Sequence, residues 1–187
     1  MIGVYLIGLI TVSAILWAAT YVRNQKYRKA DTGQVTLHVS GALQKTWDGH
    51  ASFDLLELDK DVLSDARIWV ISMYDEWSQK RNFQLSLSSL CDGSLTQPIP
   101  GSYVIAPGSY GSTSAFSASY SHIVDGDKLD IYEYSTLHEG SGVLIIETAN
   151  DREIHGNFIF TAHRYDNPLT KLNRIEVTGK FTARRVV

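Results

Sequence analysis

The chain has 187 residues, of which 44% are apolar and 20% are charged, and its formal net charge is −3. From Asp31 onward it carries all 20 acidic residues but only 13 of the 17 basic ones, which gives this part a net charge of −7. This balance disfavours nucleic-acid binding, because contacts with phosphates need clustered Lys and Arg. The single cysteine, Cys91, excludes a disulfide within the chain, so cysteine content does not indicate a redox compartment.

Residues 1–22 carry no charge and predict a transmembrane anchor helix. At about 1.5 Å per residue the run spans roughly 33 Å, enough to cross a hydrocarbon core of about 30 Å. Trp17 and Tyr21 lie near one end, where interfacial aromatic residues are expected to contact membrane lipid. A cleaved signal peptide is the alternative, but the start has no basic residue and the apolar run is too long.

Residues 23–33 are polar, have no apolar periodicity and predict a basic linker. Four basic residues come directly after the span: Arg23, Lys26, Arg28 and Lys29. The positive-inside rule, taken alone, places the C-terminal domain in the cytoplasm. Exported domains are also tethered by N-terminal anchors with almost no preceding tail, so the linker leaves both orientations open.

Residues 34–187 predict one antiparallel β domain, a sandwich or barrel of about ten strands. The clearest strand is the last, in which Ile175, Val177 and Phe181 alternate with polar residues, a period that a helix cannot satisfy. Asp125-Gly126 and Asn150-Asp151 predict hairpin turns, and a short helical turn is possible over residues 59–65. The expected strands cover residues 34–40, 50–58, 66–74, 82–90, 102–106, 115–122, 128–134, 142–148, 153–163 and 173–184.

Residues 100–182 carry a recurring set of glycine and aromatic motifs. Pro100-Gly101-Ser102-Tyr103 precedes Ser141-Gly142-Val143-Leu144-Ile145-Ile146, and Gly156-Asn157-Phe158-Ile159-Phe160-Thr161-Ala162 precedes Val177-Thr178-Gly179-Lys180-Phe181. This succession resembles bacterial β-rich domains of unknown function that are lipid-anchored or secreted, with G-T-Y, S-G-x-V-x-I, G-x-F-x-F-x-A and T-x-G-x-F patterns. The resemblance implies export. It implies no catalytic residue, and the chain lacks a lipobox cysteine near its N-terminus.

The sequence offers little catalytic or metal-binding chemistry. Six histidines share no metal-ligand spacing, and His38, His50 and His155 fall at polar positions of expected strands. His138-Glu139 is expected in a loop before Gly140, and Asp125-Gly126-Asp127 with Asp130 lacks the pattern of an EF-hand. Cys91 is expected at a turn or strand end. We therefore expect neither an enzyme nor a cofactor or metal site.

Three functions are compatible with these features. The first is a non-enzymatic binding or assembly subunit of a bacterial envelope complex, held in the inner membrane by one span with its β domain in the periplasm. The second is an immunity- or inhibitor-type protein, and the third is a lipocalin-like carrier of an apolar ligand. The first two need a protein partner. The loop over residues 101–111 is rich in Tyr, Ser and Gly, so Tyr103 and Tyr110 are the candidate partner contacts.

Overall fold

The computed structural model describes residues 32–57, 67–75, 83–91, 97–107, 115–124, 130–164 and 173–186. The predicted anchor over residues 1–22 lies outside these ranges, as do all but the last two residues of the predicted linker over residues 23–33. The predicted turn at Asp125-Gly126 and the possible helical turn over residues 59–65 lie outside them as well. None of the described residues belongs to a helix long and apolar enough to cross a membrane.

The described part of the chain is all-β, as predicted. Its strands are β1 Gly33–Gly41, β2 Lys45–Glu57, β3 Arg67–Tyr74, β4 Phe83–Cys91, β5 Gly101–Ile105, β6 Ala115–Val124, β7 Asp130–Ala149, β8 Glu153–Arg164 and β9 Arg174–Arg185.

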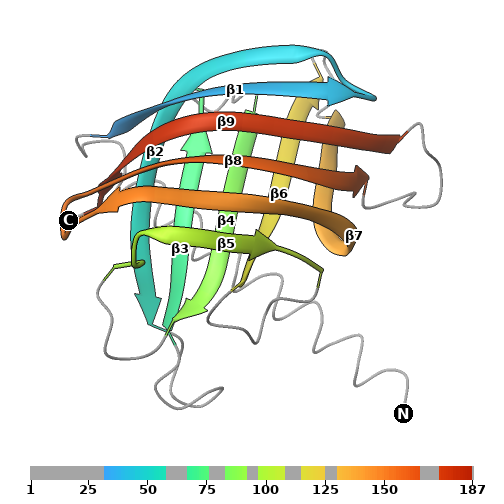
Figure 1. Cartoon of the computed structure of the whole chain (residues 1–187). Coiled ribbons are helices and arrows are strands. Elements are labelled where there is room, and N and C mark those ends of the chain that lie inside the picture. The colour runs from blue at the N-terminus through green and yellow to red at the C-terminus, as the bar shows by residue number, and fades with distance from the viewer. Residues whose placement is uncertain are drawn as a thin grey trace, which may run out of the picture. The chain divides into compact units, whose positions relative to one another are not determined.

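The strands close into a barrel in the order β1-β2-β3-β4-β6-β5-β7-β8-β9, with β9 paired to β1. Figure 1 shows two layers whose strands cross steeply: β1, β9, β8, β7 and β5 form one, and β2, β3, β4 and β6 form the other. Strands that pass from one layer to the other make the corners, as in orthogonally packed sheets. β2 pairs with β1 through its first half and with β3 through its second half.

One strand, β7, replaces two that the sequence predicts over residues 128–134 and 142–148. Its first part pairs with β6 and its later part pairs with β5, while β8 follows it along the other side. The register shifts between Ser135 and Gly140, and Gly140 has a φ of 153°. A positive φ is accessible to glycine at little cost, so the strand bends at this point without ending.

Thr136 fills the gap that this bend leaves beside β6. Its side chain is fully buried. Its Oγ1 accepts a hydrogen bond from the backbone N–H of Ala118 at 3.0 Å and lies 3.3 Å from the carbonyl oxygen of the same residue, to which it donates. One hydroxyl thus satisfies backbone groups that the β6–β7 ladder no longer pairs.

The alternation predicted for the last strand is confirmed. Ile175, Val177, Phe181 and Ala183 of β9 are buried, whereas Arg174, Glu176 and Lys180 are exposed. The buried side chains of the described strands form one apolar core, which includes Phe53, Phe83, Phe116, Tyr120, Leu144 and Phe160. Fully burying one such side chain contributes about 1.5–3 kcal/mol, so the period-two pattern determines which face of each strand stabilises the domain.

Glycines lie opposite phenylalanines where β8 and β9 pair. Phe158 faces Gly179, and Phe181 faces Gly156. A Cβ on Gly156 would lie 3.0 Å from Cζ of Phe181, so each ring occupies the space above its glycine. This arrangement explains the glycine–aromatic motifs: the rings cover backbone that has no side chain of its own at strongly curved positions.

Two local predictions from the sequence are also confirmed. The Asn150 side chain accepts hydrogen bonds from the backbone N–H groups of Arg152 and Glu153, both at 2.9 Å, and so closes the predicted turn between β7 and β8. Cys91 is the last residue of β4 and is buried.

Candidate functional site

A row of serines crosses the side of the strands that faces away from the core, from the buried Ser52 at one end to the exposed Ser119 near the other. Ser52 faces Ser72, Ser72 faces Ser86, Ser86 faces Ser119, and Ser119 faces Ser135, so five adjacent strands from β2 to β7 each contribute one serine. With neighbouring strands about 4.8 Å apart, the row extends over about 19 Å. We call these five residues the serine row. Strands usually place β-branched or aromatic residues on such a face, so this run of small hydroxyl side chains is unusual.

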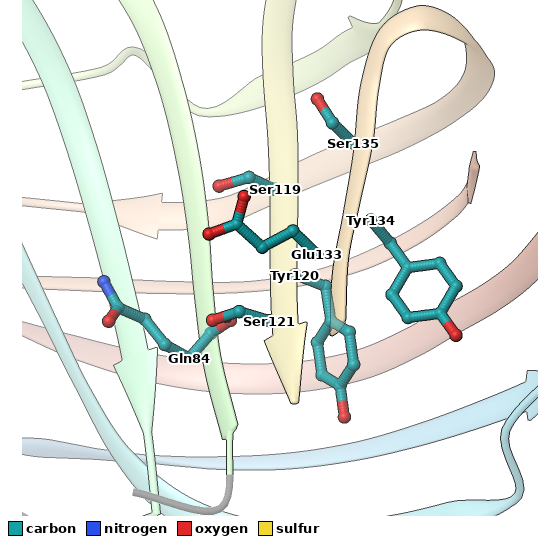
Figure 2. Close-up of a pocket in the computed structure, with 7 residues that line it drawn as sticks. All are labelled: Gln84, Ser119, Tyr120, Ser121, Glu133, Tyr134 and Ser135. Atoms are coloured by element: carbon teal, nitrogen blue, oxygen red, sulfur yellow. Dashed lines mark hydrogen bonds between the residues drawn. The ribbon is translucent and has the colours of Figure 1, made fainter. Parts of the chain in front are cut away.

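The serine row ends in a hollow of about 300 Å³ between β4, β6 and β7, which we call the serine recess. Figure 2 shows Gln84, Ser119, Ser121 and Glu133 extending to one side of these strands, while the Tyr120 and Tyr134 rings extend to the other, into the barrel. The recess is thus an external, hydrogen-bonding surface. It is lined by Gln84, Ser119, Tyr120, Ser121, Glu133, Tyr134 and Ser135.

The part of β6 that lines the recess is fixed by side chains packed in the core. Tyr120 is fully buried, and its hydroxyl accepts a hydrogen bond from the Trp47 indole N–H at 3.1 Å. Burial raises the pKa of the Tyr120 phenol, outweighing the Trp47 hydrogen bond, which lowers it. The Phe83 ring stacks against Tyr120 at 6.5 Å between centroids. The inward side chain of Tyr120 therefore fixes the position of the β6 backbone that carries the outward residues Ser119 and Ser121.

Among the described residues that line the recess, Glu133 is the one with a formal charge, since the other six are Gln, Ser and Tyr. The Glu133 side chain is exposed and lies over the serine hydroxyls in Figure 2. A carboxylate beside hydroxyl and amide groups suits a ligand group that is cationic and donates hydrogen bonds. Among the described residues, no group of three or more His, Cys, Asp or Glu side chains is placed to hold a metal ion.

The candidate contact Tyr103 lies away from the recess and packs inward. Its ring meets Phe116 edge-on at 5.3 Å between centroids, and its hydroxyl donates a hydrogen bond to the Ile99 carbonyl at 2.5 Å. Partial burial raises the pKa of the Tyr103 phenol. The described contacts of Tyr103 are therefore internal ones, and the other candidate contact, Tyr110, lies outside the described residues.

One hydroxyl, one imidazole and one carboxylate line up elsewhere, on the outer face of β8 and β9. Thr182 Oγ1 and His155 Nδ1 are hydrogen-bonded at 3.0 Å, His155 Nε2 lies 2.5 Å from Glu153 Oε1, and Arg184 donates to Glu153 Oε2 at 3.2 Å. The His155 hydrogen bond, followed by that of Arg184, lowers the pKa of the Glu153 carboxyl.

This alignment is a cross-strand contact rather than a built nucleophile. Thr182 and His155 are directly opposite in the ladder, and His38 and Thr46 repeat the same opposed pair in β1 and β2 at 3.1 Å. Such pairs stabilise sheets by about 0.2–1 kcal/mol. The serine recess includes neither His155 nor Thr182, and acyl transfer needs a substrate cleft with oxyanion donors beside the nucleophile.

The structure corrects the placement of His138-Glu139. The sequence predicts a loop before Gly140, but both residues belong to β7. Glu139 is exposed, and its backbone carbonyl accepts a hydrogen bond from His163 Nδ1 at 3.0 Å. The prediction was wrong because the loop expected here is a bulge inside β7: residues 136–139 have no ladder partner in β8, which pairs through His163 with Ser135 and through Ala162 with Gly140 on either side of them. Of the residues in the acidic group Asp125-Gly126-Asp127 with Asp130, only Asp130 lies within the described strands.

No protein-family model, curated protein sequence or solved structure matches the chain. The resemblance to exported β-rich domains therefore stays a prediction, and function has to be inferred from the surface of the barrel itself.

The serine row was not predicted from the sequence. Its signal is present in two segments, where serines are two residues apart: Ser86 and Ser88 in one, and Ser117, Ser119 and Ser121 in the other. Recognising the row also required knowing that β4 pairs with β6 rather than with β5, which the order of strands along the chain does not indicate.

Proposed function

We propose that this protein is a membrane-tethered, non-enzymatic binding subunit that engages a protein partner through the serine recess. The observation that carries the proposal is the position of Glu133 beside the hydroxyls of Ser119, Ser121 and Ser135 on an open outer face. We expect the partner to present a basic side chain, because the described lining of the recess offers a carboxylate and hydrogen-bonding oxygens and includes no Lys, Arg or His.

The chemistry of the recess supports recognition. Serine hydroxyls donate and accept hydrogen bonds with little side-chain entropy to lose, so they adapt to polar partner groups. The rigid strands beneath them keep these groups in fixed positions, which lowers the ordering cost of binding. The anchor and linker predicted over residues 1–33 would hold this face near a bacterial inner membrane, with the β domain in the periplasm.

The lipocalin-like carrier is less well supported. Carriers of that type hold their ligand inside the barrel, whereas here the inward side chains of the described strands form one continuous apolar core. Aromatic rings such as those of Trp47, Phe83 and Tyr120 contact one another there. We therefore place the binding surface outside the barrel.

Site-specific photo-crosslinking in cells tests the proposal. A photoreactive residue at Ser119 is expected to give one discrete protein adduct in the membrane fraction. The same residue at Thr148, an exposed position in the other layer, serves as the matched control. Glu133→Lys is expected to reduce the Ser119 adduct at least about tenfold, since like charges repel a basic partner group. The proposal is overturned if Ser119 gives no adduct beyond that of Thr148, or if the adduct is insensitive to Glu133→Lys.

A further inference from the structure

Four apolar side chains form a patch on the outer face of β5, β7 and β8, in the layer opposite the serine recess. Val104, Ile145 and Ile159 are 57%, 40% and 47% exposed, and the half-buried Val143 lies between them. Val104 faces Val143, and Val143 faces Ile159, so one residue from each strand aligns across the sheet. We call Val104, Val143, Ile145 and Ile159 the outer apolar patch.

The surroundings of this patch have the anatomy of an interface. The aligned row continues from Ile159 to Thr178 of β9, which faces it directly. Uncharged residues flank the row along the strands: Ser102 and Asn157 on one side, Ser141 and Thr161 on the other. Beyond Ile145, the exposed Glu147 accepts a hydrogen bond from Asn157 at 2.8 Å, so the charges lie outside the apolar centre. An apolar centre with a polar border is the anatomy of an interface.

Two opposite charges flank Thr178 on β9. Lys180 lies on one side of the row and Glu176 on the other, and both side chains are exposed. Within the part of the chain that the structure describes, neither makes a hydrogen bond or an ion pair. Each lies two residues from Thr178 along β9, on opposite sides of the aligned row. A two-fold axis running along this row would therefore bring Lys180 of one molecule opposite Glu176 of a second.

We propose that this face packs against the same face of a second copy of the chain, related by that two-fold axis. Ile159, Val143 and Val104 then lie along the axis and contact their own symmetry mates. Lys180 of each copy faces Glu176 of the other, so the interface gains two reciprocal ion pairs. Ile145 faces the small Ser141 of the other copy, which matches a large side chain to a small one. An isologous contact of this kind closes on itself as a dimer.

The expected area makes the dimer weak in dilute solution. The face is four strands wide and about five residues long, roughly 19 Å by 17 Å, which lies below the standard interface of about 800 Å² per partner. Association therefore depends on concentration, and a chain confined to a membrane surface would dimerise more readily than one in free solution.

Cysteine crosslinking of the full chain in membranes tests the dimer. Cys91 is buried, so an introduced thiol dominates the reaction with a short bifunctional maleimide. Thr178→Cys, on the axis, is expected to give a homodimer adduct. Ser119→Cys, in the other layer, is the matched control and is expected to give at least about tenfold less.

Charge reversal supplies the second readout. In the Thr178→Cys background, Lys180→Glu and Glu176→Lys alone are each expected to reduce the adduct about tenfold, because each places like charges opposite one another. The double variant with both changes is expected to restore the adduct. The proposal is overturned if Thr178→Cys crosslinks no better than Ser119→Cys, if the single reversals leave the adduct unchanged, or if the double variant does not recover it.

Discussion

The Phe158 ring covers Gly179 so closely that a Cβ on the glycine would lie 2.5 Å from the ring's Cζ. The two residues are directly opposite in the ladder between β8 and β9. The Phe158 ring thus occupies the space that a side chain at position 179 would need, and it covers the backbone of the curved strand there.

Gly179→Ala should destabilise the domain by about 1–3 kcal/mol, because Phe158 must leave its position to admit one methyl group. Gly101→Ala is the matched control: a Cβ there would meet nothing within 4 Å, so we expect a change within about 0.5 kcal/mol. Urea unfolding at neutral pH measures both. Equal effects of the two substitutions would contradict the ring–glycine interpretation.

Phe181→Ala should cost about 3–5 kcal/mol of unfolding free energy, a large share of a typical domain's stability. Its ring is buried and covers Gly156, so truncation removes apolar contacts and leaves a cavity. Arg174→Ala, at an exposed position of the same strand, should cost about 0.5 kcal/mol or less. Denaturant titration of the two variants distinguishes the faces; similar losses would show that the core has been assigned wrongly.

Tyr120→Phe should make stability less sensitive to alkaline pH. Burial raises the pKa of the Tyr120 phenol above its ordinary value of about 10, so the folded protein keeps a proton that the unfolded chain releases. The contribution of this phenol to the free energy of unfolding is therefore fully present below about pH 10. Above that pH it falls by about 1.4 kcal/mol per pH unit, until the folded protein also loses the proton. Urea midpoints between pH 8 and pH 11 should fall less steeply in the variant. If the urea midpoints of the wild type and the variant fall equally with pH, deprotonation of Tyr120 does not contribute to the loss of stability.

Glu153→Gln should reduce the loss of stability in acid. His155 first, and Arg184 second, lower the pKa of Glu153 in the folded state, so its contribution is present above the ordinary carboxyl pKa of about 4.3. That contribution is lost as pH falls through the folded-state pKa. The drop in melting temperature from pH 7 to pH 3 should therefore be smaller in the variant. An unchanged drop would show that this carboxyl does not contribute.

Ser119→Cys tests the predicted topology. Ser119 is exposed and Cys91 is buried, so an impermeant maleimide should label the variant and leave the wild type unlabelled. Labelling in intact spheroplasts is the expected result for a periplasmic β domain. Protection until lysis would place the domain in the cytoplasm and favour the positive-inside interpretation of Arg23, Lys26, Arg28 and Lys29.

Local sequence pattern was enough to assign which side of a strand enters the core. Alternation in residues 174–184 separated Val177 and Phe181 from Arg174 and Lys180, and the structure confirms that division. The pattern also identified the turn at Asn150-Asp151, because a short side chain that hydrogen-bonds its own backbone is a local device. Both features depend on neighbours within a few residues, which the order of amino acids contains directly.

Which strands lie side by side became known only from the folded barrel. The serine row needs β4 next to β6, and the outer apolar patch needs β5 next to β7, although neither pair is consecutive in the chain. Period-two alternation assigns a residue to a face but leaves strand order and register open, since both depend on pairing between distant segments. Ser86 and Ser119, like Val104 and Val143, become neighbours only when these non-consecutive strands pair, and the proposed surfaces exist only from that point.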